Sequence, residues 1–104
     1  MDSYVHFVYR LTKHFPKEEI FGTTSQLKRA TLSVVLNFIE GYAREQGKTN
    51  KNYMSIAYGS LQESKYLIEF CQVEGFINNE EANEVLKMAD EIGAILWRIT
   101  HNNK

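Results

Sequence analysis

The sequence contains one cysteine, one proline and no apolar run near the roughly 18 residues that span a bilayer. The single cysteine, Cys71, cannot form a disulfide within the chain, and its apolar neighbours Leu67, Ile68 and Phe70 predict a buried thiol. The opening residues, MDSYVHFVYR, lack the basic start and apolar stretch of a signal peptide. These absences predict a cytoplasmic protein with no membrane segment.

The sequence also lacks a Gly/Ser/Pro-rich linker, a low-complexity tract and an internal repeat. With 104 residues, of which 43% are hydrophobic and 24% charged, it has the composition of one globular domain over residues 1–104. The net charge of −1 combines +3 in residues 1–65 (nine Lys/Arg against six acids) with −4 in residues 66–104 (three against seven). Proteins that bind duplex nucleic acid usually carry a larger basic excess, so at most one mildly basic face is expected.

Strand and hairpin patterns are missing as well, and the apolar spacing is helical throughout. We predict helices over about 2–14, 23–46, 49–74 and from residue 78 onward, with a single helical turn over 17–21. Pro16 ends the first helix because proline cannot donate the next backbone bond. Gly47 is expected to end the second helix, and Gly75 followed by Phe76 the third.

The predicted starts of these helices carry capping residues. Thr23 and Gln26 have the spacing of a capping box, in which each side chain bonds the other residue's backbone N–H. Thr49 or Asn50 is expected to cap the third helix, and Asn78 the fourth. The buried face predicted for the fourth helix consists of Val85, Ala89, Ile92, Leu96 and Ile99.

Four helices with short connections place neighbours antiparallel, so the predicted fold is an all-α, up-down antiparallel four-helix bundle. The first helix is short, near 20 Å, whereas the others reach roughly 30–35 Å at 1.5 Å per residue. Such a bundle leaves apolar surface uncovered. Either residues are missing before Met1 or another subunit covers the gap, and we favour a shortened start.

The second helix has more apolar surface than one bundle face needs. Leu27, Val34 and Phe38 lie on one side of a helical projection, and Leu32, Leu36, Ile39 and their neighbours lie on another. The apolar arc is about twice the 100° typical of a surface helix, and the third helix is similarly broad. Because a four-helix bundle has no central helix, we predict a homo-oligomer rather than a monomer.

A polar stripe interrupts the second helix in the segment LNFIEGYARE, residues 36–45. Glu40 and Arg44 have the i,i+4 spacing of an ion pair. Asn37 could bond a polar group on the third helix, where YGSLQES supplies hydroxyls and a carboxylate, and Gly41 would allow a close backbone approach. The residues predicted to serve helix packing or assembly are Asn37, Glu40, Gly41, Arg44, Ser60 and Glu63. The alternative is a strip that contacts a ligand or nucleic acid through Arg29 and Arg44.

Catalytic constellations are not apparent. His6, His14 and His101 have no Glu three residues before them, as a di-metal bundle requires, and one cysteine cannot support a zinc site. The pairs Gly22-Thr23 and Gly59-Ser60 do not form a phosphate-binding loop. We therefore predict a protein that is not an enzyme and has no cofactor, metal site or catalytic residue.

The segments YRLTKHFPKEEIFGTTSQLKRAT, NFIEGYARE, AYGSLQES and EIGAILWRI, in this order, resemble the small bacterial four-helix-bundle proteins encoded by intervening sequences in 23S ribosomal RNA genes. The resemblance covers nearly the whole chain. It implies a homopentamer and brings no established biochemical role and no known catalysis. The residues that match the family's motifs are Gln26, Leu27, Arg29, Asn37, Glu40, Gly41, Arg44, Ser60, Leu61 and Glu63.

The resemblance thus favours a self-assembling interaction or scaffold protein. It extends to accessory proteins of diversity-generating retroelements, which implies as the alternative a factor that binds RNA, DNA or a nucleic-acid-handling protein. The basic residues that would contact nucleic acid are Lys28, Arg29, Arg44, Lys48 and Lys51.

Overall fold

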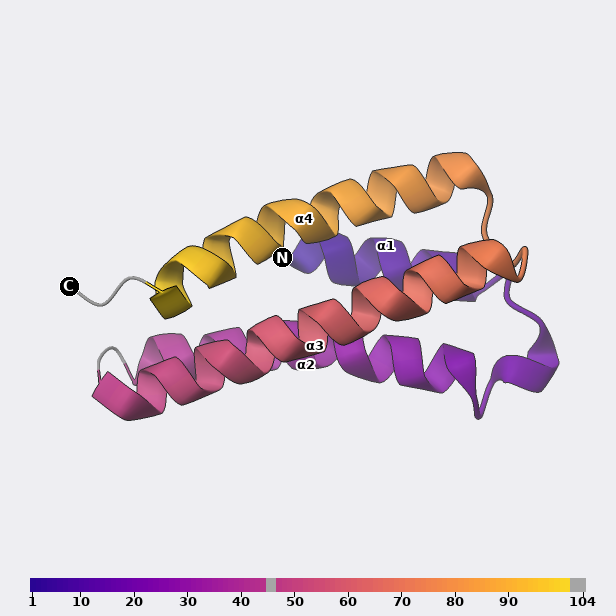
Figure 1. The fold of residues 1–104 in the computed structure, drawn as a ribbon. Coiled ribbons are helices and arrows are strands. Elements are labelled where there is room, and N and C mark those ends of the chain that lie inside the picture. Colours follow the sequence, from indigo (N-terminus) through magenta and orange to yellow (C-terminus); the bar gives the residue numbers. More distant parts are fainter. Residues whose placement is uncertain (45–46, 102–104) are drawn as a thin grey trace.

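A computed structural model describes residues 1–44 and 47–101, with the side chains of residues 47 and 48 excepted. The described residues form four α-helices and one short 3₁₀ turn (Figure 1). They are α1 (Asp2–Thr12), η1 (Lys17–Glu19), α2 (Thr23–Ala43), α3 (Gly47–Val73) and α4 (Asn79–His101). The described residues include no β-strand, which confirms the predicted all-α four-helix bundle.

The helices run up and down along a common long axis, so that each is antiparallel to the next (Figure 1). The bundle measures 44 × 24 × 18 Å. Contacts join α1 to α2, α2 to α3, α3 to α4 and α4 to α1, which closes a four-sided arrangement, and the α2–α3 interface is the most extensive. The α2–α3 pair is therefore the central scaffold of the molecule.

One apolar stripe from each helix forms the core. Val8, Val34, Leu61 and Leu96, one from each helix, are completely buried. Burial of such a side chain contributes about 1.5–3 kcal/mol to folding. On α4 the predicted face is buried at Val85, Ala89, Ile92 and Leu96, whereas Ile99 is only partly buried.

Two predicted helix ends are confirmed in atomic detail. Gly75 has a φ of 82°, its N–H donates to the Gln72 carbonyl at 3.1 Å, and the Phe76 N–H donates to the Cys71 carbonyl at 2.8 Å. These two hydrogen bonds form a Schellman motif, which satisfies carbonyls in the last turn of α3. At the start of α4, the Asn78 side chain accepts from the Glu81 N–H at 2.7 Å, and the Glu81 carboxylate accepts from the Asn78 N–H at 3.0 Å.

Other predicted ends were wrong. Gly22, not Thr23, is the N-cap of α2, and its carbonyl accepts the Gln26 N–H at 3.0 Å, so the predicted capping box does not form. The first helix ends at Thr12 instead of residue 14. The second ends at Ala43, and the predicted end at residue 46 lies outside the described residues.

The start of α3 also differs from the prediction. The helix begins at Gly47, which places Thr49 and Asn50 inside its first turn rather than at its cap. Asn50 instead donates from its side chain to the Gly41 carbonyl at the end of α2, at 2.5 Å. The Asn50 side chain of α3 thus adds a second hydrogen bond to the Gly41 carbonyl, which also accepts from the Arg44 N–H at 3.2 Å.

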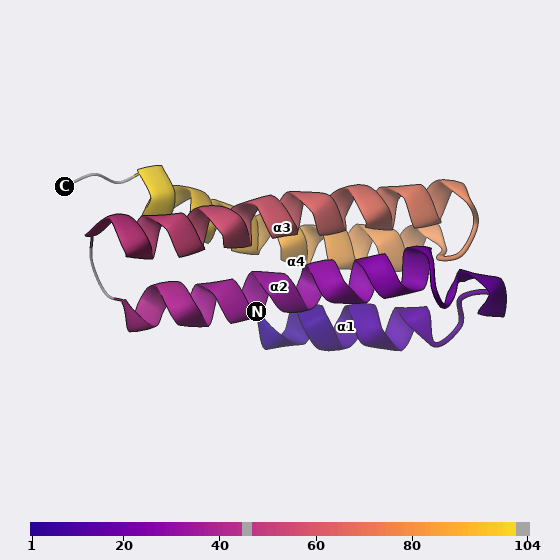
Figure 2. The same ribbon diagram turned by 90° about the horizontal axis from the view of Figure 1, so that it is seen from below.

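As predicted, α1 is short: it has 11 residues, against 21, 27 and 23 in the other three helices. It runs beside only half of α2, and the N-terminus lies near the middle of the bundle (Figure 2). Met1 and Asp2 lie close to Phe38 and Ile39 of α2. Beyond them, Tyr42 is 73% exposed. Over the described residues, none of the helices is long and apolar enough to cross a membrane.

Candidate functional site on α2 and α3

The polar stripe of α2 lies against α3, and its bonds differ from the prediction. The Ser33 hydroxyl lies 2.8 Å from the Ser60 hydroxyl and joins the two helices. Asn37 donates to the Ser33 carbonyl at 2.8 Å and to its hydroxyl at 3.0 Å. The predicted bond from Asn37 to α3 was therefore wrong: Asn37 bonds its own helix four residues back and supports the serine that makes the crossing.

Two ion pairs flank this serine bridge. Arg29 of α2 pairs with Glu63 of α3 at 2.5 Å and also bonds Gln26 at 3.0 Å. Arg44 pairs with Glu40 at 3.2 Å, which confirms the predicted i,i+4 pair. All four charged side chains of the pairs are about half exposed, so each pair contributes only about 0.2–1 kcal/mol. Their main effect is to neutralise the arginines on this face.

Gly41 sits at a tight contact between α2 and α3. A Cβ at this position would lie 3.1 Å from Met54 Cε, 3.2 Å from Tyr53 Cβ and 3.3 Å from the Asn50 carbonyl oxygen. These distances are shorter than ordinary carbon contacts of about 3.5–4.0 Å. The predicted role of Gly41 in a close helix approach is thus confirmed within one chain.

The face of α2 that points away from the core is apolar and exposed. Leu32 is 39% exposed, Leu36 57% and Ile39 55%, and Ala43 is also exposed. We call these four residues the outer seam. Their spacing of four, three and four residues places them within an arc of about 60°. It is the spacing by which one helix packs along another in a coiled coil.

Other apolar side chains on α3 are exposed as well. Ile56 is 51% exposed and Phe70 37%, whereas Met54, Leu61 and Ile68 of the same helix are buried in the core. The two apolar faces predicted for α2 and α3 therefore exist, and in each helix the core covers only one of them.

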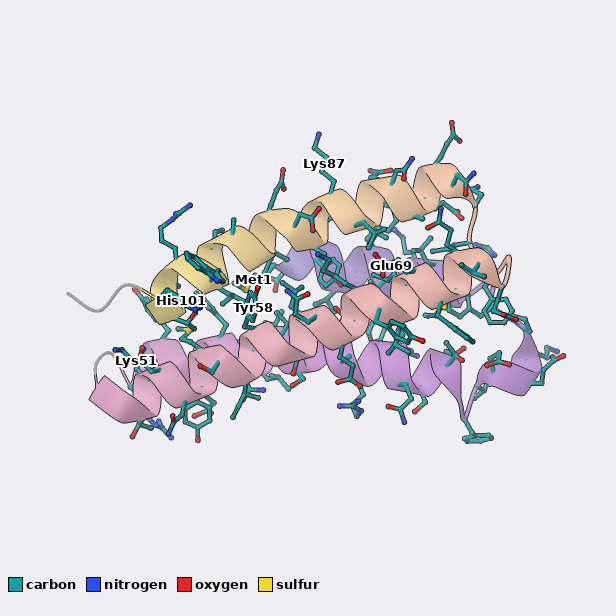
Figure 3. The ribbon with its side chains drawn as sticks, in the orientation of Figure 1. Met1, Lys51, Tyr58, Glu69, Lys87 and His101 are labelled. Atoms are coloured by element: carbon teal, nitrogen blue, oxygen red, sulfur yellow. The ribbon has the colours of Figure 1, made fainter. Side chains whose placement is uncertain are left out.

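The basic residues predicted to contact nucleic acid do not gather in one place. Lys28 lies over the Tyr9 ring toward α1, with its Nζ 4.7 Å from the ring centroid, whereas Arg29 and Arg44 are paired with acids. Lys51 lies at the end of the bundle where α2 gives way to α3 (Figure 3), far along the hairpin from Lys28. Lys48 lies outside the described side chains.

A buried polar pair inside the bundle was missed by the sequence reading. The Tyr4 hydroxyl of α1 lies 2.6 Å from the Ser64 hydroxyl of α3, and Ser64 donates its own proton to the Leu61 carbonyl at 2.7 Å. Tyr4 must then be the donor to Ser64. Burial raises the pKa of Tyr4 to about 12, although the bond to Ser64 acts in the opposite direction. Tyr4 stands on the apolar stripe of α1, and that position was the only signal for a buried partner.

The remaining candidate groups for chemistry are dispersed. Cys71 is buried as predicted, and its pKa is raised to about 11 by burial, with Glu19 and Glu74 adding to the effect. His6, His14 and His101 are all exposed. Among the described residues, no group of three or more His, Cys, Asp and Glu side chains could hold a metal ion.

A protein-family model matches most of the chain. The model of the family described as "23S rRNA-intervening sequence protein" matches residues 2–98. The match includes α1, α2, α3 and all but the last turn of α4. No curated protein matches the chain.

Proposed function

Because this chain belongs to the 23S rRNA-intervening sequence protein family, we propose that it is a non-enzymatic protein that assembles with copies of itself and serves as an interaction scaffold. The outer seam carries this proposal. Leu32, Leu36 and Ile39 each expose at least 39% of their surface, although they lie on a helix whose other face is completely buried. Contiguous apolar surface of this kind marks an interaction site.

The occupant that fits the outer seam is a helix of a second copy. The seam has the spacing of a helix-packing surface, and a partner helix would remove the leucine and isoleucine side chains from water. The Glu40–Arg44 pair lies along α2 itself, whereas the Arg29–Glu63 ion pair and the Ser33–Ser60 bridge join α2 to α3 beside the seam. They are placed to fix the rotation of α2 and hence the direction in which the seam points. The family resemblance implies a ring of five copies.

The first prediction concerns Leu36, which is exposed in the single chain and so can be replaced without harm to the core. Leu36→Glu should give particles of one chain, 12.1 kDa, because assembly would bury an unpaired carboxylate. Val73→Glu is the matched control, since Val73 is 84% exposed and lies outside the seam. Light scattering of the two variants distinguishes them. A Leu36→Glu variant with the mass of the wild type would rule out the outer seam as the assembly surface.

The alternative, a factor that binds nucleic acid, is less well supported by the charges. Glu63 and Glu40 neutralise two of the basic residues on which it depends, Arg29 and Arg44. If the assembled protein nevertheless binds RNA or DNA, retention must weaken steeply as salt rises. Salt-dependent retention of nucleic acid by the wild type would favour this alternative over a scaffold that binds protein.

A further inference from the structure

Figure 2 shows the corner where the chain turns from α1 through η1 into α2. A cavity of about 530 Å³ lies at this corner. Its lining comes from three places: the last turn of α1, the loop after η1 and the first turns of α2. The lining residues that matter for a ligand are Tyr9, Lys13, Phe21, Thr24, Ser25 and Lys28. Every one of them belongs to a single copy, so this site does not depend on self-assembly.

One wall of the cavity is apolar and unusually exposed. The Phe21 side chain is 97% exposed and Ile20 is 50% exposed. Tyr9 adds an aromatic ring on the α1 side. A phenylalanine that packs against almost nothing in the folded chain gains contact with any apolar group that enters beside it. This wall suits an apolar part of a ligand.

The other wall is electropositive. Gly22 is the N-cap of α2 and has no side chain to accept from the first-turn N–H groups, which carry the positive end of the helix dipole. Lys13 and Lys28 also line the cavity. No carboxylate is among the lining residues in the described part of the chain. A competing charge is Glu19, whose carboxylate oxygen lies 3.6 Å from where a Gly22 Cβ would stand.

A buried polar group without a partner lies in this wall. Thr24 is 8% exposed and lines the cavity, and its hydroxyl is the buried side-chain oxygen that has no hydrogen-bond partner among the described residues. Buried polar atoms are normally bonded, so an unpaired one calls for an explanation. Threonine in a helix divides between two rotamers, and rotation about the Cα–Cβ bond moves the hydroxyl to another staggered position. A rotamer that points into the cavity would allow the Thr24 hydroxyl to donate a hydrogen bond to a bound ligand.

We propose that this cavity binds a small amphipathic anion, in which a phosphate or carboxylate faces the first turn of α2 and the apolar part packs against Phe21. The Lys13 and Lys28 ammonium groups supply opposite charge. The Thr24 and Ser25 hydroxyls and the first-turn N–H groups donate hydrogen bonds to the anion. The Tyr9 ring holds Lys28 at the cavity through the cation–π contact.

The test is an NMR titration of the ¹⁵N-labelled full chain with four probes: phenyl phosphate, phenylacetate, inorganic phosphate and benzyl alcohol. At least one of the first two should shift the amides of Thr23, Thr24 and Ser25, with a Kd of about 1 mM for a ligand of this size. The other two probes should bind at least about tenfold more weakly, because each lacks one half of the required chemistry. The proposal is overturned if neither aromatic anion binds, or if inorganic phosphate or benzyl alcohol binds as tightly.

Two variants distinguish a ligand-binding role of Thr24 from a purely structural role. Thr24→Val should weaken binding about threefold to tenfold by removing one hydrogen bond to the anion, while its melting temperature stays at or above that of the wild type. Thr31→Val is the control, because the Thr31 hydroxyl, also buried in α2, is already bonded to the Leu27 and Lys28 carbonyls. Equal affinity in Thr24→Val and Thr31→Val would overturn the role of Thr24.

Two charge variants test the electropositive wall of the cavity even if Thr24→Val folds poorly. Lys13 is exposed, so Lys13→Gln should leave the fold intact and weaken binding of the aromatic anion. Glu19→Gln removes a competing carboxylate beside Gly22 and should strengthen binding. Opposite changes in affinity support the proposal, and affinities that are the same in both variants contradict it.

Discussion

Small and polar residues inside the helices of this protein are explained by their neighbours on α3. Gly41 leaves room for Met54 and Tyr53, and Ser33 reaches across to Ser60. Tyr4 finds a hydroxyl partner in Ser64 at the centre of the bundle. Each of these residues lowers helix propensity or costs desolvation on its own, and each is compensated by one specific contact.

At the residue scale, Tyr4 predicts how stability depends on alkaline pH. An unfolded tyrosine loses its proton near pH 10, whereas the folded protein holds the Tyr4 proton until about pH 12. Unfolding therefore releases a proton in this range, and stability falls as pH rises. The expected loss from this group is about 2 kcal/mol between pH 9 and pH 12. Cys71, whose pKa is raised from 9.0 to about 11, adds a loss that begins near pH 9.

Urea unfolding followed by circular dichroism from pH 7 to pH 12 measures this loss. Tyr4→Phe should be less stable at neutral pH by about 1 kcal/mol, because one hydrogen bond is lost, and should then decline less steeply above pH 10. Tyr66→Phe is the control, since Tyr66 is 65% exposed. If Tyr4→Phe and the wild type decline with the same slope, Tyr4 is not the buried titrating group.

At the scale of elements, the α2–α3 pair depends on the absence of a side chain at Gly41. Gly41→Ala gains about 1 kcal/mol of helix propensity but forces a methyl group to within 3.1–3.3 Å of three atoms on α3. Overpacking of this kind costs typically 1–3 kcal/mol. We therefore expect Gly41→Ala to leave the free energy of unfolding unchanged or to lower it.

Gly59→Ala is a matched control for this prediction. Gly59 lies within α3, and a Cβ there would meet nothing within 4 Å, so its substitution should stabilise the protein by about 0.5–1 kcal/mol. Thermal unfolding should place Gly41→Ala at least about 1 kcal/mol below Gly59→Ala. Equal stabilisation by both substitutions would show that the close approach of α2 and α3 is not needed.

The helices and their buried stripes could be predicted from the sequence because hydrophobic periodicity and helix-capping residues are local signals. The Gly75-Phe76 stop and the Asn78 cap act through the backbone of their own segment, and the structure places them as expected. The N-cap of α2 was misplaced by one residue, since Gly22 and Thr23 are adjacent candidates and local sequence does not decide between them.

The polar contacts between helices were harder to predict, because they depend on rotation and register. Asn37 has Ser33 four residues earlier, so a bond along its own helix was available and is the one that forms. Asn50 was expected as a cap, but its side chain donates to the Gly41 carbonyl of α2, which also accepts from the Arg44 N–H. Ser64 sits between exposed Glu63 and half-buried Lys65, and only the packed bundle shows that it faces Tyr4.

At the scale of the whole molecule, all four helices contribute to one buried core, and one apolar face of α2 lies outside that core. The short α1 leaves half of α2 without its bundle neighbour (Figure 2). The outer seam faces away from the core, and Leu36 and Ile39 are each more than half exposed. These features make assembly with further copies the central claim for this member of the 23S rRNA-intervening sequence protein family.

The mass of the wild-type chain in solution tests that claim most directly. Sedimentation equilibrium over a wide concentration range should give a whole-number multiple of 12.1 kDa, five copies if the family resemblance extends to the ring. Because the seam is apolar, the multiple should persist at high salt. A particle of 12.1 kDa at every concentration would contradict the account.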